Sequence, residues 1–142
     1  MRLWHYKLIK FIPKSQLLAQ WRELNSIFKK KDNHILINYA YEYPDENLVA
    51  YANIVLEEMD KRHIRVRSFD NYINLVCVTE PRSVDALMGC NPFKKHHDDR
   101  YLLQCFFNLQ EKYDRGQKDF SKEEYERLES FVMKEATRWH SR

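Results

Sequence analysis

Apolar residues recur at helical spacing between Pro13 and Lys31, and this pattern limits the fold of the chain more than any other stretch does. The segment reads PKSQLLAQWRELNSIFKKK, and its proline suits the first turn of a helix. Because residues three and four apart share a helix face, the spacing predicts a helix over 13–31 that packs one side against a core. That side is formed by Leu17, Leu18, Trp21, Leu24 and Phe28.

The opposite face of this predicted helix carries amides, a carboxylate and a cation. At about 100° of rotation per residue, the polar residues that fall together there are Gln16, Gln20, Glu23 and Lys30. Most helices present a charged, solvated outer face. On spacing alone, Glu23 is therefore either an ordinary surface residue or part of a site.

Glycine and proline are scarce, with two glycines and four prolines in 142 residues. Hairpins, β-sandwiches and glycine-rich phosphate loops depend on these residues, so their scarcity favours long helices. Hydrophobic residues make up 44% of the chain and aromatic residues 14%, which is enough to fill a core. We therefore predict a mainly α protein in which residues 1–142 form a single compact domain.

Start and stop signals predict three further helices. Pro44 and the acids after it open one helix, and Gly116 ends another that begins at position 98 or 99. Ser121 and Glu124 form a capping box that opens the last. The three predicted helices span residues 44–63, 98–115 and 121–136.

The remaining stretches have weaker patterns. Residues 1–12 alternate aromatic, basic and aliphatic side chains, and we expect an extended arm packed across the first helix, which fixes the terminal amine in space. ILINYAYEY at 35–43 indicates an extended, buried segment, and NLVCV at 74–78 indicates a short strand. Residues 80–95 read as a loop with one helical turn, and we assign no function to 68–95.

Positive charge is concentrated at the start of the chain. Residues 1–34 hold eight lysines and arginines against two acids, a net +6, while the remainder holds sixteen against nineteen, a net −3. A concentrated basic region attracts phosphates by counterion release, although basic termini can also be merely solubilising. KRHIRVR at 61–67 is a second basic cluster, which either complements a helix end or flanks a phosphate backbone.

Cysteine and apolar patterns bear on the compartment. Three cysteines without CxxC spacing do not predict a disulfide framework. No apolar run approaches the ~20 residues of a membrane span, and no signal-like segment precedes a small-residue cleavage site. We therefore expect a reduced, cytoplasmic protein.

The first helix also carries a resemblance to a known family. The residues that align with it without a gap are Leu17, Ala19, Arg22, Glu23, Leu24, Phe28 and His34. On these residues the chain resembles the pyrimidine dimer DNA glycosylases of the phage endonuclease V type, and its opening MRLWHYKLI resembles a bacterial branch of them. YPDENLVAYANIVLEEMDKRHIRV at 43–66 and HHDDRYLLQCFFNLQEKY at 96–113 are similar to later parts of the family. The resemblance implies a three-helix core, with the helix at 121–136 as an addition.

The resemblance implies a chemistry for the start of the chain. Enzymes of this family attack C1′ of the damaged nucleoside with the terminal α-amine, and a glutamate stabilises the developing charge and moves the C2′ proton. An α-amine suits this role because it ordinarily loses its proton near pH ~7.7–8.0, well below lysine at ~10.4. Catalytic roles are thus implied for Met1 and Glu23. DNA contact is implied for Arg22 and for Gln16, which occupies the position of a DNA-contacting histidine.

Further expectations concern binding. We expect DNA contacts from Arg2, from Lys29 and Lys30 at the end of the first helix, and from Arg65 in the second basic cluster. The expected partner is double-stranded damaged DNA, such as DNA with pyrimidine dimers, bound by a monomer without a metal or cofactor. In a bacterium we expect the protein in the cytoplasm at the nucleoid.

The sequence departs from the family at three places. Position 2 is Arg2, a bulky residue, whereas active members expose a small residue after methionine removal, so we expect Met1 to remain. One residue spans ~3.5 Å, so either the Met1 amine is the nucleophile or the lyase chemistry has been lost. Ser26 stands where the family has an arginine, and its aromatic tail has no clear counterpart beyond Trp139.

Two alternatives to a DNA-repair enzyme remain at this stage. The domain is then either a nucleic-acid-binding module without catalysis or a protein-interaction domain that uses the aromatics of the last helix. His96-His97-Asp98, with His5 or His34, invites a metal reading, but adjacent histidines lack the spacing of most metal sites. We expect these histidines to serve as a cap or a phosphate contact.

Overall fold

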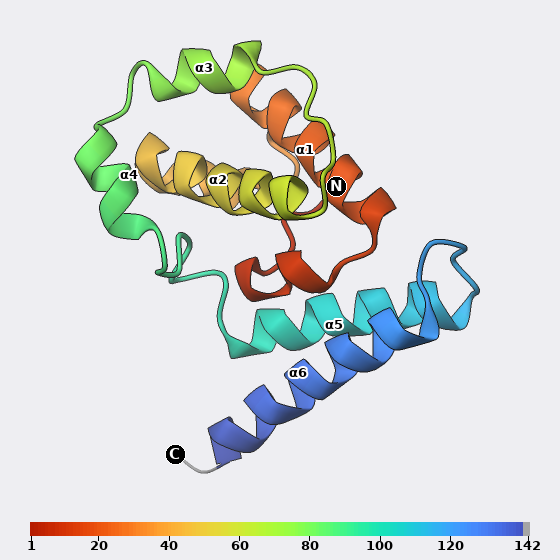
Figure 1. The fold of residues 1–142 in the computed structure, drawn as a ribbon. Coiled ribbons are helices and arrows are strands. Elements are labelled where there is room, and N and C mark those ends of the chain that lie inside the picture. The colour runs from red at the N-terminus through yellow and green to blue at the C-terminus, as the bar shows by residue number, and fades with distance from the viewer. Residues whose placement is uncertain (141–142) are drawn as a thin grey trace.

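The structure is a computed structural model that describes residues 1–140, with side chains through residue 139. All regular elements among the described residues are helical, which confirms the prediction of a mainly α protein (Figure 1). No helix in this part of the chain is long and apolar enough to cross a membrane. The α-helices are α1 Lys14–Lys29, α2 Asp45–Lys61, α3 Asp70–Val76, α4 Pro81–Leu87, α5 Asp99–Asp114 and α6 Lys122–His140, and the 3-10 helices are η1 Tyr6–Phe11 and η2 Asn38–Glu42.

Helix α2 forms the centre of the fold. It packs against α1, α3, α4, η1 and η2, and Figure 1 shows it surrounded by α1, α3 and α4. Its residues Leu48 to Ala52 are all buried, so this segment is covered on every side rather than along one stripe. A helix that is apolar all round needs such an enclosed position.

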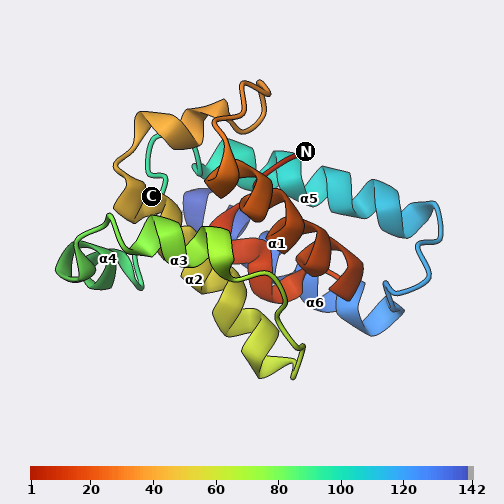
Figure 2. The same cartoon turned by 90° about the horizontal axis from the view of Figure 1, so that it is seen from above.

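Helices α5 and α6 form a hairpin against the other side of the arm. Figures 1 and 2 show η1 lying between the α1–α4 group and this hairpin, and η1 contacts both α2 and α6. The predicted capping box is present, because the Ser121 N–H donates to Glu124 and the Glu124 N–H donates back to Ser121, each over 3.1 Å. Gly116, at φ +83°, ends α5 in the left-handed conformation that glycine adopts freely.

Three local predictions differ from the structure. The strand expected at 74–78 is instead the end of α3 and a turn, because Tyr72 packs its ring against Trp21 and Phe28 and holds the segment helical. The segment expected to be extended at 35–43 is a turn followed by η2. There the Tyr41 hydroxyl donates to the Ile27 carbonyl at 3.1 Å and ties the segment to the end of α1. Helix α4 occupies part of the stretch that was read as loop, with Pro81 in its first turn.

The predicted arm is extended only over its first five residues. His5 then caps η1 by accepting the Lys7 N–H at its Nδ1 atom over 3.2 Å. Leu3, Leu8 and Ile9 are buried in the core on either side of this cap. The arm is therefore anchored by apolar burial, as expected, but half of it is a 3-10 helix.

Candidate active site and nucleic-acid interface

The arm is joined to α1 by Gln20, whose side chain is fully buried at 0% exposure. Its Oε1 accepts the Trp4 N–H at 2.8 Å and the Tyr51 hydroxyl at 2.9 Å. Its Nε2 donates to the Arg2 carbonyl at 3.0 Å and to the Glu23 carboxylate at 3.1 Å. Both N–H groups and the oxygen of this buried amide thus have hydrogen-bond partners.

Glu23 lies half-buried where the arm meets α1. The oxygen that Gln20 contacts also faces the Arg2 N–H at 3.5 Å. Burial raises the pKa of the Glu23 carboxyl, and the Arg2 N–H and the positive terminal amine oppose that rise. Arg22 and His34 also lower its pKa through their positive charge. A carboxyl whose pKa lies above its ordinary value is suited to exchanging a proton near neutral pH.

The terminal amine lies near enough to Glu23 to influence its pKa. Met1 is 40% exposed, and its amine is close enough to Glu23 to act on the charge of that carboxyl. The Arg2 N–H that faces Glu23 is one residue, ~3.5 Å at most, from the amine. The structure therefore brings together Met1 and Glu23, the two residues for which catalysis was predicted.

A groove of about 630 Å³ runs along the neighbouring face of α1. Leu18, Trp21 and Met59 give it an apolar floor. The Trp21 indole N–H donates to the Arg67 carbonyl at 2.8 Å and so holds the 63–68 segment against α1. No carboxylate is among the lining residues, and the cations along the groove are Lys14, Arg22, Arg65 and Arg67.

The first half of the chain matches a known family. The family model described as pyrimidine dimer DNA glycosylase matches residues 1–72, which is just over half of the 142 residues. The chain belongs to the pyrimidine dimer DNA glycosylase family. The matched region contains the arm, α1, the Gln20 contacts and the basic 63–68 segment. Searches of curated proteins and of solved structures gave no significant match.

The residues expected to contact DNA are dispersed in this family member. Arg22 and Arg65 share the groove, while Lys29 and Lys30 are exposed at the far end of α1. Arg2 turns inward and places its guanidinium 5.9 Å from the ring centroids of both Trp4 and Tyr101. These two rings hold the Arg2 charge at the protein surface beside the arm rather than extended into solvent.

Gln16 is paired within the protein. Its Nε2 donates to Gln117 at 3.1 Å, and its Oε1 accepts from Gln117 at 2.6 Å. The loop between α5 and α6 supplies Gln117, and this loop lies outside the region matched to the family. The loop between α5 and α6 thus occupies the groups with which Gln16 was expected to contact DNA.

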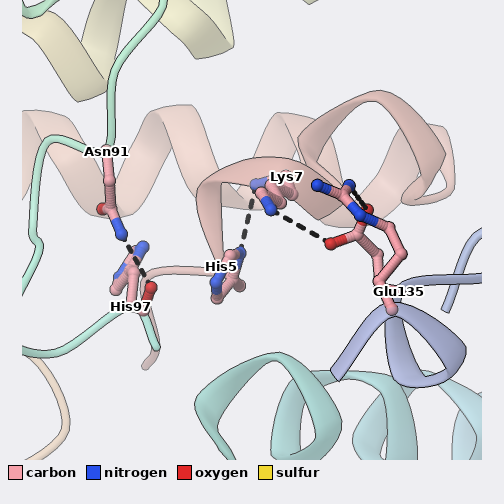
Figure 3. Close-up of polar contacts among 6 residues, drawn as sticks. His5, Lys7, Asn91, His97 and Glu135 are labelled. Atoms are coloured by element: carbon pink, nitrogen blue, oxygen red, sulfur yellow. Dashed lines mark hydrogen bonds and ion pairs between the residues drawn. The ribbon is translucent and has the colours of Figure 1, made fainter. Parts of the chain in front are cut away.

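His5, within the arm, and His97, which packs against it, have roles that the sequence did not reveal (Figure 3). His97 is 1% exposed and accepts the Tyr6 N–H at Nδ1 over 3.2 Å, while its Nε2 pairs with the Tyr39 hydroxyl at 2.7 Å. Burial lowers the pKa of His97, and burial together with the nearby Lys7 charge lowers that of His5 to about 4. His97 is therefore a neutral acceptor for the arm, and not the cap or phosphate contact that was expected.

His5 and His97 were also considered as possible metal ligands. The His5 and His97 rings are stacked with centroids 5.4 Å apart, and His97 uses both ring nitrogens for hydrogen bonds. Among the described residues, no group of three or more histidine, cysteine, aspartate or glutamate side chains could hold a metal ion.

Lys7 joins η1 to the C-terminal helix, as Figure 3 shows. Its ammonium lies 3.1 Å from the Glu135 carboxylate, which also accepts from Arg138 at 3.0 Å. Burial acts to raise the pKa of Glu135, but the hydrogen bond and charge of Lys7 and the charge of Arg138 outweigh it and lower the pKa. Helix α6 thereby fixes the side of the arm that faces away from α2.

Proposed function

We propose that this protein is a DNA glycosylase with abasic-site lyase activity, in which the Met1 α-amine is the nucleophile and Glu23 the proton-transfer group. One observation carries the proposal: the half-buried Glu23 carboxyl, whose pKa is raised, faces the Arg2 N–H and lies within reach of the charge of the terminal amine. Membership of the pyrimidine dimer DNA glycosylase family supports damaged DNA as the substrate.

The proposed reaction uses only groups of the chain and its substrate. The free amine attacks C1′ of the damaged nucleotide, and the bond to the base breaks, with its electron pair leaving on the base. Loss of a proton from nitrogen and opening of the sugar ring then give an imine to C1′. Glu23 next removes a C2′ proton, and the 3′ phosphate leaves with the electron pair of its C3′–O bond. The negative charge of Glu23 also stabilises the cationic species before this elimination.

The groove along α1 is the proposed contact for the phosphate backbone. Lys14, Arg22, Arg65 and Arg67 line it and no carboxylate is among the lining residues, so phosphates bound there meet net positive charge. Arg22 also lies beside Glu23 in sequence, so a strand that follows the groove passes the proposed catalytic pair. Lys29 and Lys30 continue the positive charge to the end of α1. We propose that the protein acts as a monomer on bacterial nucleoid DNA in the cytoplasm.

Borohydride trapping on an abasic-site oligonucleotide tests the enzyme. The reduced imine should join protein to DNA covalently, and the intact mass of the adduct should place the link at Met1. Acetylation of the amine should remove the adduct, whereas Glu23→Gln should chiefly suppress strand cleavage, because Glu23 takes the C2′ proton after the imine has formed. Glu126→Gln makes the same chemical change on α6, where the carboxylate is exposed, and should leave both adduct formation and strand cleavage unchanged.

Two other outcomes would contradict the proposal. Salt-dependent DNA binding without any adduct would indicate a nucleic-acid-binding module without catalysis. The bulky Arg2 at position 2 would then explain the loss of the lyase chemistry. Absence of salt-dependent binding would point to a protein-interaction domain, because neutralising phosphates releases counterions and must give a slope with salt.

A further inference from the structure

Gln20 contacts two residues of the arm that are two positions apart. Its amide donates to the Arg2 carbonyl at 3.0 Å and accepts the Trp4 N–H at 2.8 Å. In a β-sheet, a neighbouring strand supplies such a donor and acceptor pair to an extended chain. Here the extended start of the chain lies in an all-helical protein, so a side chain takes the place of the missing strand.

The same amide reaches the proposed catalytic carboxylate. Its second N–H donates to Glu23 at 3.1 Å, so one rigid planar group sets the position of the arm relative to Glu23. We propose that Gln20 is the positioning residue that holds the Met1 amine against Glu23, and that Tyr51 fixes the orientation of its amide. We call the Gln20 amide, with its hydrogen bonds to Arg2, Trp4 and Glu23, the clamp. Its catalytic role rests on the proposed function, whereas the position of the amine can be measured without that function.

Tyr51 determines which end of the amide faces which partner. Its buried hydroxyl lies 2.9 Å from Gln20 Oε1 and 2.6 Å from the Trp4 carbonyl, and it can donate to either. Turning the amide over would set its N–H groups against the Trp4 N–H and its oxygen against Glu23. Because Gln20 is fully buried, water cannot compensate for these mismatches, so a single orientation is retained.

The clamp is tested first by the electrostatic coupling between the amine and Glu23. The side-chain carboxyl carbon of Glu23 is titrated by NMR in protein with a free or an acetylated Met1 amine. Acetylation should raise the pKa of Glu23 in the wild type, because the positive amine lowers it. In Gln20→Met, which keeps the side-chain length but cannot bridge the arm, acetylation should have no effect.

Gln110→Met is the matched control. Gln110 is a half-buried glutamine of α5 whose Nε2 donates to Tyr125 at 3.0 Å, so the same substitution there should preserve the coupling. Equal coupling in Gln20→Met and in the wild type would overturn the clamp, as would its absence in the wild type. If Gln20→Met does not fold by circular dichroism, Tyr51→Phe decides: it should weaken the coupling, and undiminished coupling would overturn the inference.

Imine formation supplies the second readout. At saturating DNA, the trapping rate of Gln20→Met should fall about 100-fold, which is the usual effect of displacing a reacting group by ~1 Å. Gln20→Glu keeps acceptors for Trp4 and Tyr51 but has no N–H groups for the Arg2 carbonyl and Glu23, so it should not restore the trapping rate at a pH where both carboxyls are ionised and repel each other. A wild type with intact coupling but no adduct would refute the lyase and leave the clamp standing. An unchanged rate in folded Gln20→Met would refute the clamp alone.

Discussion

Replacing His5 with asparagine should remove much of the pH dependence of stability between pH 4 and 6.5. His5 is 3% exposed, and its pKa is about 4 instead of the ordinary 6.5, chiefly because burial disfavours the charged ring. The nearby Lys7 charge lowers this pKa further, while the His97 backbone and the Asp98 and Glu135 charges partly oppose the shift. Asparagine does not titrate, but its side-chain oxygen can still accept the Lys7 N–H and cap η1.

The sign and size of the effect follow from proton binding. Between the folded pKa of about 4 and the ordinary value of 6.5, unfolded His5 binds a proton that folded His5 does not. The free energy of unfolding therefore rises with pH across this window, and the stability that the neutral His5 ring contributes is lost as the pH falls toward 4. At ~1.4 kcal/mol per pH unit, His5 should contribute roughly 3 kcal/mol over the whole window. Burial lowers the pKa of His97 too, so the free energy of unfolding of the wild type should fall still further toward acid pH.

Urea unfolding at pH values from 4 to 7, followed by tryptophan fluorescence, measures this difference. The wild type should show the steeper decline toward acid, and the gap to His5→Asn should narrow or reverse as the pH falls. His63→Asn is the control, because His63 is exposed at φ +56°, a conformation that asparagine tolerates. If the free energies of unfolding of wild type and His5→Asn differ by a constant amount from pH 4 to 7, His5 is not a buried neutral ring and the arm is not packed as described.

Three further predictions concern the terminus, the groove and the C-terminal helix. A glycine placed ahead of Met1 should move the amine by ~3.5 Å and lower the borohydride trapping rate at least ~100-fold, as measured by single-turnover gel assay. Arg65→Ala should reduce the slope of log Kd against log salt by about 0.9 if it loses one phosphate, whereas Lys134→Ala on α6 should not, as fluorescence anisotropy can show. Glu135→Gln should lower the free energy of unfolding in urea by ~1 kcal/mol, because its partners Lys7 and Arg138 are partly solvated.

Helices with a regular apolar period were predictable because their signals are local. The periodic stripe placed α1 within two residues of its observed ends, and the capping pair Ser121 and Glu124 placed the start of α6. Helices α3 and α4 were missed because residues 68–95 have no clean period, and packing of Tyr72 on Trp21 decides the conformation there. That contact joins residues far apart in sequence, so no local pattern reveals it.

In the candidate site too, local patterns were predictable and long-range contacts were not. Periodicity placed Gln20 and Glu23 on one helix face, but only the structure shows that the arm covers this face and turns Gln20 into a buried bridge. Gln16, one turn earlier on the same face, is paired with Gln117 instead. Sequence spacing cannot distinguish the two glutamines, because their partners are far from them in sequence and only the folded chain brings these partners to the helix.

The arm is held from two sides, and only one of them belongs to the region matched to the family. Gln20 and Tyr51 hold it from α1 and α2, within residues 1–72. His97 and Glu135 hold it from beyond residue 72, through the Tyr6 N–H and the Lys7 ammonium. A terminal amine can act as a nucleophile only if the residues behind it are fixed, since free termini otherwise fray. The C-terminal half therefore contributes to the proposed chemistry through the rigidity of the arm, without supplying a reacting group.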